Sequence, residues 1–128
     1  MKGIKIIAVS IFVLLLASGA FCAPAVTLSA TVVAGQNAQN QSFHVKNDGG
    51  GSLNYTIKSS AVWAIPGTIL GGATVENNLV IVKYNTAELA TGTYSATITV
   101  EDTAASNSPQ TVLINLAVTP KPTIGVIP

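Results

Sequence analysis

The chain has 128 residues and a formal net charge of +1, and only 9% of its residues are charged. All of its basic residues other than His44 are lysines. Because phosphate recognition relies on clustered arginine and lysine, this composition argues against nucleic-acid binding. A chain of this length can bury a core without metals or disulfides. Its single cysteine, Cys22, cannot form an internal disulfide, and we expect no cofactor.

The first 22 residues differ in character from the rest of the chain. Two lysines precede an apolar run of 12 residues, 6–17, which small residues follow. This order is typical of a secretory signal peptide, and the run is too short to span a bilayer. Cleavage after Ala20 and cleavage after Cys22 both fit the small-residue pattern. We predict a signal peptide over residues 1–22 and a secreted or extracytoplasmic location, in the periplasm or at the cell surface.

Two alternatives concern the same segment. It could be retained as a membrane anchor, or Cys22 could become acylated at a new N-terminus. Phe21 stands where lipoprotein processing favours a small residue, so we favour ordinary signal cleavage over lipidation of Cys22. Contact with a membrane is expected only through this segment or through lipidated Cys22.

After the signal segment, apolar and polar residues alternate with a period of two, which is the pattern of half-buried strands. AVTLSATVV, residues 25–33, is the first such stretch. QSFHVKN and LNYTIKS, residues 41–47 and 53–59, flank the turn cluster NDGGGS and are predicted to form a hairpin. A short strand is predicted between Trp63 and Leu70.

Three further strands complete the series. NLVIVKYN, residues 78–85, is apolar on both faces in its first half, as in a strand that lies inside a sandwich or is paired centrally. TYSATITVE and QTVLINLAVT, residues 93–101 and 110–119, alternate cleanly. About seven strands, with turn signals roughly every 8 to 12 residues, predict an all-β fold over residues 23–119, an immunoglobulin-like β-sandwich of antiparallel strands. Residues 120–128, rich in proline, are predicted to be an extended tail or linker.

The chain is poor in groups for catalysis, so we predict that it is not an enzyme. His44 is the only histidine and lies on the polar face of a predicted strand, whereas metal sites need several such ligands. Glu101 and Asp102 could bind calcium, but no Asp-rich loop accompanies them. We predict solvated acids at a strand end, with no catalytic, cofactor or metal-binding residues.

Three aromatic residues, Trp63, Tyr55 and Tyr84, are the candidate ligand-binding residues. Aromatic faces can pack on the apolar C–H surfaces of sugar rings. The alternative, which we favour for Trp63, is that a lone Trp in a sandwich of this size fills the core.

ELATGTYSATITV, residues 88–100, predicts a structural corner made by Leu89, Gly92 and Tyr94. In immunoglobulin-like sandwiches a Tyr at the start of the sixth strand bonds through its hydroxyl to a backbone group a few residues upstream. Leu89 supplies an apolar plug and Gly92 a residue free to bend. Ala96 occupies the place of the second cysteine of antibody domains, which fits a core that closes without a disulfide.

Two stretches, Phe43 to Ile65 and Leu89 to Thr119, together resemble the BACON family of bacterial immunoglobulin-like domains. The resemblance lies in a "Leu, Asn, aromatic, Thr" strand before Trp, a "Leu, Ala, x, Gly, x, Tyr" bend and a final Ser-Pro hairpin. It implies a secreted β-sandwich module that either contacts carbohydrate or a mucin-like glycoprotein or serves only as a spacer.

Two functions from different classes therefore remain. The first is a non-catalytic extracytoplasmic module that contacts a glycan or glycoprotein. The second is a structural spacer or surface subunit that pairs with partners through an exposed edge strand, with a downstream domain or a cell-surface protein as candidate partner.

Overall fold

The computed structural model describes residues 3–8, 25–67, 70–73 and 78–128. This part of the chain is all-β and contains no helix. In chain order its strands are β1 (Ile4–Ala8), β2 (Val26–Val33), β3 (Gln41–Asn47), β4 (Leu53–Ser59), β5 (Ala64–Pro66), β6 (Leu70–Ala73), β7 (Asn78–Tyr84), β8 (Gly92–Glu101) and β9 (Gln110–Thr119).

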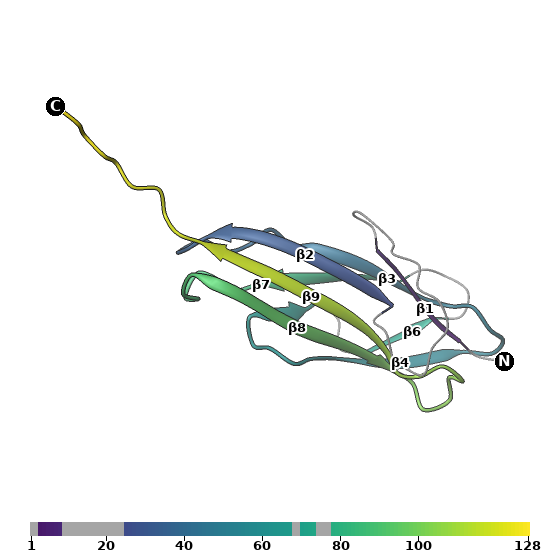
Figure 1. Ribbon diagram of the computed structural model, residues 1–128. Coiled ribbons are helices and arrows are strands. Elements are labelled where there is room, and N and C mark those ends of the chain that lie inside the picture. The colour runs from purple at the N-terminus through teal and green to yellow at the C-terminus, as the bar shows by residue number, and fades with distance from the viewer. Residues whose placement is uncertain (1–2, 9–24, 68–69, 74–77) are drawn as a thin grey trace.

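The strands form two sheets that pack as a sandwich (Figure 1). One sheet has the order β1-β3-β7-β5, and the other has the order β2-β9-β8-β4-β6. Each of the predicted strands has a counterpart in these sheets. The predicted strand between Trp63 and Leu70 becomes two short strands, β5 and β6, one in each sheet. The all-β sandwich fold is therefore confirmed.

The predicted hairpin between β3 and β4 is wrong. β3 pairs with β1 and β7, whereas β4 pairs with β6 and β8 in the other sheet. The turn cluster instead carries the chain from one sheet to the other, and the buried side chain of Asn47 holds it. Asn47 Nδ2 donates to Gly51 O at 2.8 Å, and Asn47 Oδ1 accepts from Gly49 N at 2.9 Å. Alternation fixes which face of a strand is buried but does not choose its neighbour.

One pairing departs from the expected antiparallel arrangement. β2 and β9 are parallel, with Val26 opposite Val112 at one end and Val33 opposite Thr119 at the other. A parallel pair needs a long connection between its strands. Here the rest of the sandwich between Val33 and Gln110 supplies that connection, so nothing local in the sequence reveals the direction.

The core lies between the two sheets and is built from the alternating apolar positions that the sequence shows. The most deeply buried side chains are Phe43, Val45, Leu53, Val80, Val82, Ile98, Val100, Val112 and Ile114. β7 is paired on both sides, by β3 and β5, as expected for a central strand. Its second apolar face does not enter the core, because Leu79 and Ile81 are exposed on the outer surface of the sheet.

β1 lies inside the segment predicted to be a signal peptide. It pairs antiparallel with β3, from Ile4 opposite Asn47 to Ala8 opposite Phe43. Most of that segment, including residues 9–22 with both cleavage positions and Cys22, lies outside the described residues. The signal peptide stays a prediction. Among the described residues, no helix has the length and hydropathy needed to cross a membrane.

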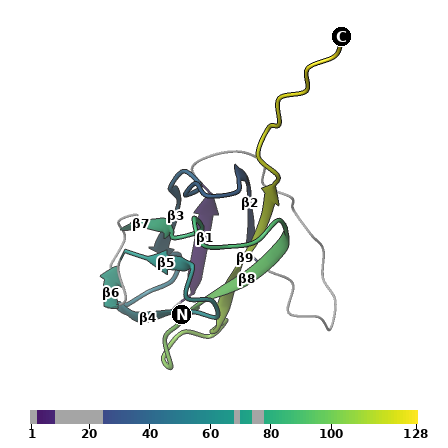
Figure 2. The same ribbon diagram turned by 90° about the vertical axis from the view of Figure 1, so that its left-hand side faces the viewer.

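Residues 120–128 extend away from the sandwich as an exposed tail without regular structure (Figures 1 and 2). The tail leaves the body at Thr119, the last residue of β9. Its three prolines fix backbone φ angles and remove N–H donors, which favours an extended path.

Candidate functional site

A bend before β8 positions Tyr94 at the corner of the sandwich. Gly92 has a φ of 153°, a backbone conformation that side chains with a Cβ rarely adopt. Tyr94 then turns back, and its hydroxyl donates to Ala90 O at 2.8 Å. Leu89 is half-buried and packs against the core. The three residues thus hold the loop before β8 against the start of that strand.

Two of the three candidate ligand-binding aromatics meet behind this corner. The ring centroids of Trp63 and Tyr84 lie 6.4 Å apart in a stacked arrangement, and the edge contact between Trp63 and Tyr94 measures 6.3 Å between centroids. Trp63 is only 8% exposed, and Tyr84 is buried as well. Such pairs stabilise a core beyond the area that they bury. Their faces are covered by protein and offer no platform for a sugar ring.

Tyr55, the third candidate, lies apart from this pair. It is buried on β4, and its hydroxyl accepts a hydrogen bond from Asn78 Nδ2 at 3.2 Å. Tyr55 therefore belongs to the core of the sandwich, as Trp63 and Tyr84 do.

Tyr84 links the two sheets through a chain of hydrogen bonds. Its hydroxyl donates to Gln41 Oε1 at 2.7 Å, and Gln41 Nε2 donates to Ser29 O on β2 at 2.9 Å. Burial raises the pKa of Tyr84 to about 12, because a phenolate is poorly solvated there. The neutral hydroxyl is the form that the core requires.

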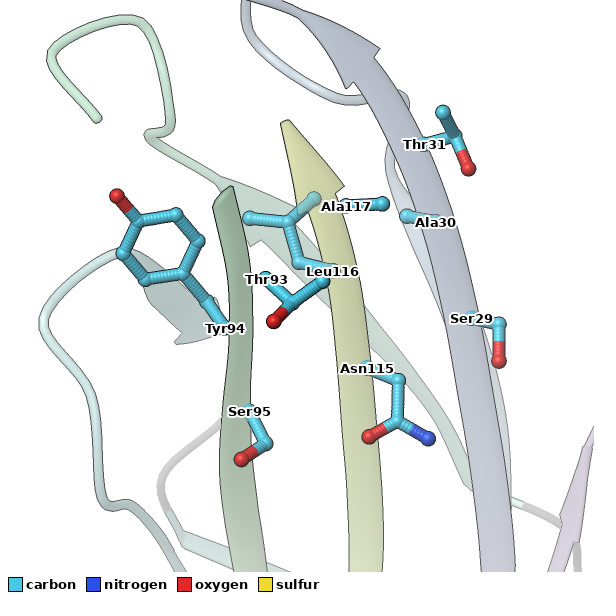
Figure 3. A pocket seen from close by; sticks show the side chains of 9 residues that line it. All are labelled: Ser29, Ala30, Thr31, Thr93, Tyr94, Ser95, Asn115, Leu116 and Ala117. Atoms are coloured by element: carbon cyan, nitrogen blue, oxygen red, sulfur yellow. The ribbon is translucent and has the colours of Figure 1, made fainter. Parts of the chain in front are cut away.

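A hollow of about 420 Å³ lies on the outer face of β2, β9 and β8 (Figure 3). Two rows of residues cross it, and the register of the strands puts them side by side. Its lining is Ser29, Ala30, Thr31, Thr93, Tyr94, Ser95, Asn115, Leu116 and Ala117. One row joins Ser29, Asn115 and Ser95, and the other joins Thr31, Ala117 and Thr93.

The chemistry of this hollow is polar and uncharged. Hydroxyl groups both donate and accept hydrogen bonds, and an amide adds two donors and an acceptor. The side chains of Ser29, Ser95 and Asn115 are exposed on the outer face. Ala117 is small, so it leaves space between Thr31 and Thr93 (Figure 3). The arrangement can bind a neutral polar ligand through several hydrogen bonds.

Sequence reasoning missed this hollow. The sequence predicts Tyr94 in the corner, and the structure shows that this residue lines the hollow as well. The remaining signal was present only as polar residues at outward positions. Bringing Ser29 beside Asn115 depends on the parallel pairing of β2 and β9, which no local pattern indicates.

The prediction that both acids at the end of β8 are solvated is wrong for Asp102. Asp102 is 6% exposed. Its carboxylate accepts from Asn54 N at 2.8 Å and from Ala104 N at 2.8 Å, and its own N–H donates to Ser108 Oγ at 3.0 Å. The carboxylate therefore ties the turn after β8 to the start of β4.

Glu101 behaves differently from its neighbour. It lies at the surface and accepts a hydrogen bond from Lys58 Nζ at 2.6 Å. This hydrogen bond and the charge of Lys58 lower the pKa of Glu101. Within the part of the chain that the structure describes, no three His, Cys, Asp or Glu side chains gather as metal ligands would. His44 lies half-buried on the outer side of β3.

No protein-family model matches the sequence, and no curated protein matches it significantly. Solved structures match the fold. The ASH/PapD-like domain 7 of human CEP192 shares 10% identity at a TM-score of 0.55, with 91% of this chain and 97% of that one covered. The N-terminal domain of PorA shares 14% identity at a TM-score of 0.50, with 92% and 97% covered.

A Bacteroides ovatus GH5 xyloglucanase, solved with a XXXG heptasaccharide, also contains a similar region. The identity is 16% at a TM-score of 0.55, with 77% of this chain covered. This chain spans 18% of the length of that enzyme. At such identities the likeness shows the fold alone. The fold of the protein is an immunoglobulin-like β-sandwich.

Proposed function

We propose that this protein is a BACON-like, non-catalytic module of a bacterium that acts outside the cytoplasm and contacts carbohydrate or a mucin-like glycoprotein. The observation that supports a carbohydrate ligand is the uncharged hollow on β2, β9 and β8, which is lined by hydroxyl and amide groups. Neutral glycans present the complementary hydroxyl groups. The motifs that resemble the BACON family support the class of module. The occurrence of a similar sandwich within a xyloglucanase supports a carbohydrate ligand.

The site of this proposal differs from the one that the aromatic residues suggested. Trp63, Tyr55 and Tyr84 stabilise the core, so the glycan would rest on the outer face of the sheet. Tyr94 is the one aromatic residue in the lining, and its ring packs towards Trp63 and the core. Binding through hydrogen bonds without a broad aromatic platform is expected to be weak for a single sugar. A repeating polysaccharide or a densely glycosylated protein gains from multiple contacts.

The test is the migration of the purified protein through gels that contain neutral polysaccharides or mucin. We expect retardation by at least one of them. Ala117→Phe fills the hollow between Thr31 and Thr93 and should abolish retardation. Thr99→Phe introduces the same ring at an outward position of the neighbouring strand β8, outside the lining, and should leave retardation intact. Mobility that no glycan changes, or retardation that Ala117→Phe leaves intact, would refute glycan binding at the hollow.

A second candidate function is a structural subunit that pairs with a partner through an edge strand. The observation that favours it is the edge of β3, which accepts β1 in antiparallel register. Edge strands present rows of N–H and C=O groups that can pair with another chain. This function does not need the hollow, so the two candidates can be tested separately.

A further inference from the structure

The outer edge of β3 depends on a segment that is predicted to be removed. β3 pairs with β7 on one side and with β1 on the other. β1 lies inside the predicted signal peptide, so cleavage after Ala20 or Cys22 would take it away. The pairing extends beyond the strand, since Asp48 N donates to Gly3 O at 3.2 Å. Without β1, this side of β3 presents unpaired N–H and C=O groups, which form a template for another strand.

The residues of the exposed tail are of the types that favour a β-strand, although the tail pairs with neither sheet. Ile124 and Val126 are 95% and 90% exposed, and Ile127 is nearly as open to solvent. Ile124 and Val126 are two residues apart, so they would lie on one face of an extended segment. Their β-branched side chains suit a strand. Three large aliphatic side chains held in water gain free energy from any sheet that covers them.

The tail also repeats the pattern of β1. Ile4-Lys5-Ile6-Ile7 and Ile124-Gly125-Val126-Ile127 carry β-branched aliphatic residues at the same first, third and fourth positions. We propose that the segment Thr123–Ile127 of one copy adds to β3 of a second copy, at the edge that β1 occupies. In the register of β1, Ile124 lies opposite Asn47 and Val126 lies opposite Val45.

The prolines of the tail are compatible with this register. Pro122 would stand opposite Gly49, beyond the end of β3 at Asn47. Pro128 takes the position of Ala8. Hydrogen-bonded and non-hydrogen-bonded pairs alternate along an antiparallel ladder. Counting from the bond between Asp48 N and Gly3 O, the position of Ala8 belongs to a non-hydrogen-bonded pair. Pro128 would therefore lose no bond there.

The tail cannot reach this position on its own copy. The start of β3 lies beside Ser29, because the Gln41 side chain bonds to Ser29 O. Asn47 lies six residues farther along β3, which is about 20 Å farther from the tail at the usual rise per residue. In the opposite direction, four residue pairs of the β2–β9 ladder separate Ser29 from Thr119, where the tail begins. These four pairs span about 13 Å. The five steps from Thr119 to Ile124 span at most about 18 Å. The body and the tail also diverge in both views (Figures 1 and 2).

The resulting contact joins different surfaces of two copies. Each copy then carries one donor tail and one acceptor edge, so the assembly grows from head to tail into a ring or an open chain. This inference names the partner of the edge strand and rests on the second candidate function. It does not involve the hollow, so glycan binding succeeds or fails independently of it.

The experiment expresses residues 1–128 in an exporting bacterium. Mass spectrometry of the purified product should show that residues 4–8 have been removed. Light scattering after size exclusion should show an average mass that rises at least twofold with protein concentration. Gly125→Pro removes a donor at a hydrogen-bonded position of the proposed ladder and should give a monomer at every concentration. A Cβ at Gly125 meets nothing within 4 Å, so the folded body is unaffected.

Val62→Asp is the matched control for exposed apolar residues. Val62 is 93% exposed and lies outside the tail, so its replacement should leave the assembly unchanged. Fluorescence of the buried Trp63 confirms that each variant is folded. A synthetic peptide of residues 119–128 should also raise the melting temperature of the Gly125→Pro protein, and a peptide with the same Gly125→Pro change should not.

Cross-linking identifies the acceptor. With Cys22→Ser throughout, a protein carrying Lys46→Cys is mixed with one carrying Gly125→Cys, because these positions face each other in the proposed register. A disulfide-linked pair is expected. Lys83→Cys, on the outer side of β7, replaces Lys46→Cys in the control and should give none.

Three results would overturn the inference: a purified exported protein that keeps residues 4–8, a processed protein that stays monomeric, and an assembly that Gly125→Pro leaves intact. If, in addition, the mixture of the Lys46→Cys and Gly125→Cys proteins gives no disulfide-linked pair, the tail is excluded as the donor. If retardation by glycans fails while the assembly forms, only the hollow is refuted.

Discussion

The two ends of β8 are anchored in different ways. At the first end, Gly92 bends the chain and the Tyr94 hydroxyl bonds to the backbone of Ala90, against a cluster of aromatic rings. At the second end, the carboxylate of Asp102 accepts hydrogen bonds from the backbone of Asn54 and Ala104. The first anchor is local and neutral. The second is charged and spans 48 residues of the chain.

The difference teaches that a local anchor is visible in sequence and a distant one is not. Leu89, Gly92 and Tyr94 stand at fixed spacing, so the corner could be predicted. Asp102 looks like an ordinary acid at a strand end. Its role depends on Asn54, which the fold brings beside it. Losing the charged anchor should also cost more, because hydrogen bonds to charged groups are the stronger ones.

The largest effect is therefore expected at Asp102. Asp102→Ala removes the carboxylate that accepts from the backbone N–H groups of Asn54 and Ala104, so the free energy of unfolding should fall by about 3 kcal/mol or more. Asp102→Asn keeps one acceptor and should lose less. Chemical denaturation of both variants measures the difference. A loss after Asp102→Ala no greater than that after Tyr94→Phe would reverse the ranking of the two anchors.

Burial of Tyr84 in the aromatic cluster at the first end should make the free energy of unfolding depend on pH in the alkaline range. Since the pKa of Tyr84 is raised to about 12, the folded state holds this proton more tightly than the unfolded chain does. The stabilisation is complete below pH 10 and is lost as the pH rises from 10 towards 12. The total loss is on the order of 2 kcal/mol. Urea denaturation from pH 8 to 12 measures it, and the decline should be shallower in Tyr84→Phe.

Gly92→Ala probes the bend itself. The positive φ at this position should make the substitution cost about 1 to 2 kcal/mol, measured as a lower melting temperature. Gly125→Ala, in the exposed tail, is the matched glycine substitution and should change the melting temperature of the monomer very little. Equal effects at the two glycines would mean that the bend stores no strain.

Tyr94→Phe gives the smallest of these effects. It keeps the ring against Trp63 and removes only the bond to Ala90 O, so we expect a loss of about 1 kcal/mol. Because the change leaves the polar side chains of the hollow in place, retardation by glycans should persist. Binding that disappears while stability is unchanged would assign the hydroxyl to the ligand and not to the corner.

Much of the fold could be predicted because the alternation of apolar and polar residues within each strand identifies its buried face. Val112, Ile114, Leu116 and Val118 alternate in the sequence and are all buried. What failed was the choice of neighbour. The turn NDGGGS is compatible both with a hairpin and with a crossing between the two sheets. The pairing of β3 with β7 selects the crossing.

By itself the sequence determined the strands, their inward faces and the corner at Tyr94, because these depend on residues within a few positions of each other. The tertiary structure decided the rest. It made β2 and β9 parallel, buried Asp102 beside Asn54, and placed Ser29, Asn115 and Ser95 in one row. Each of these results joins residues that are far apart in the chain, and such contacts are set by how two whole sheets pack and not by any local pattern.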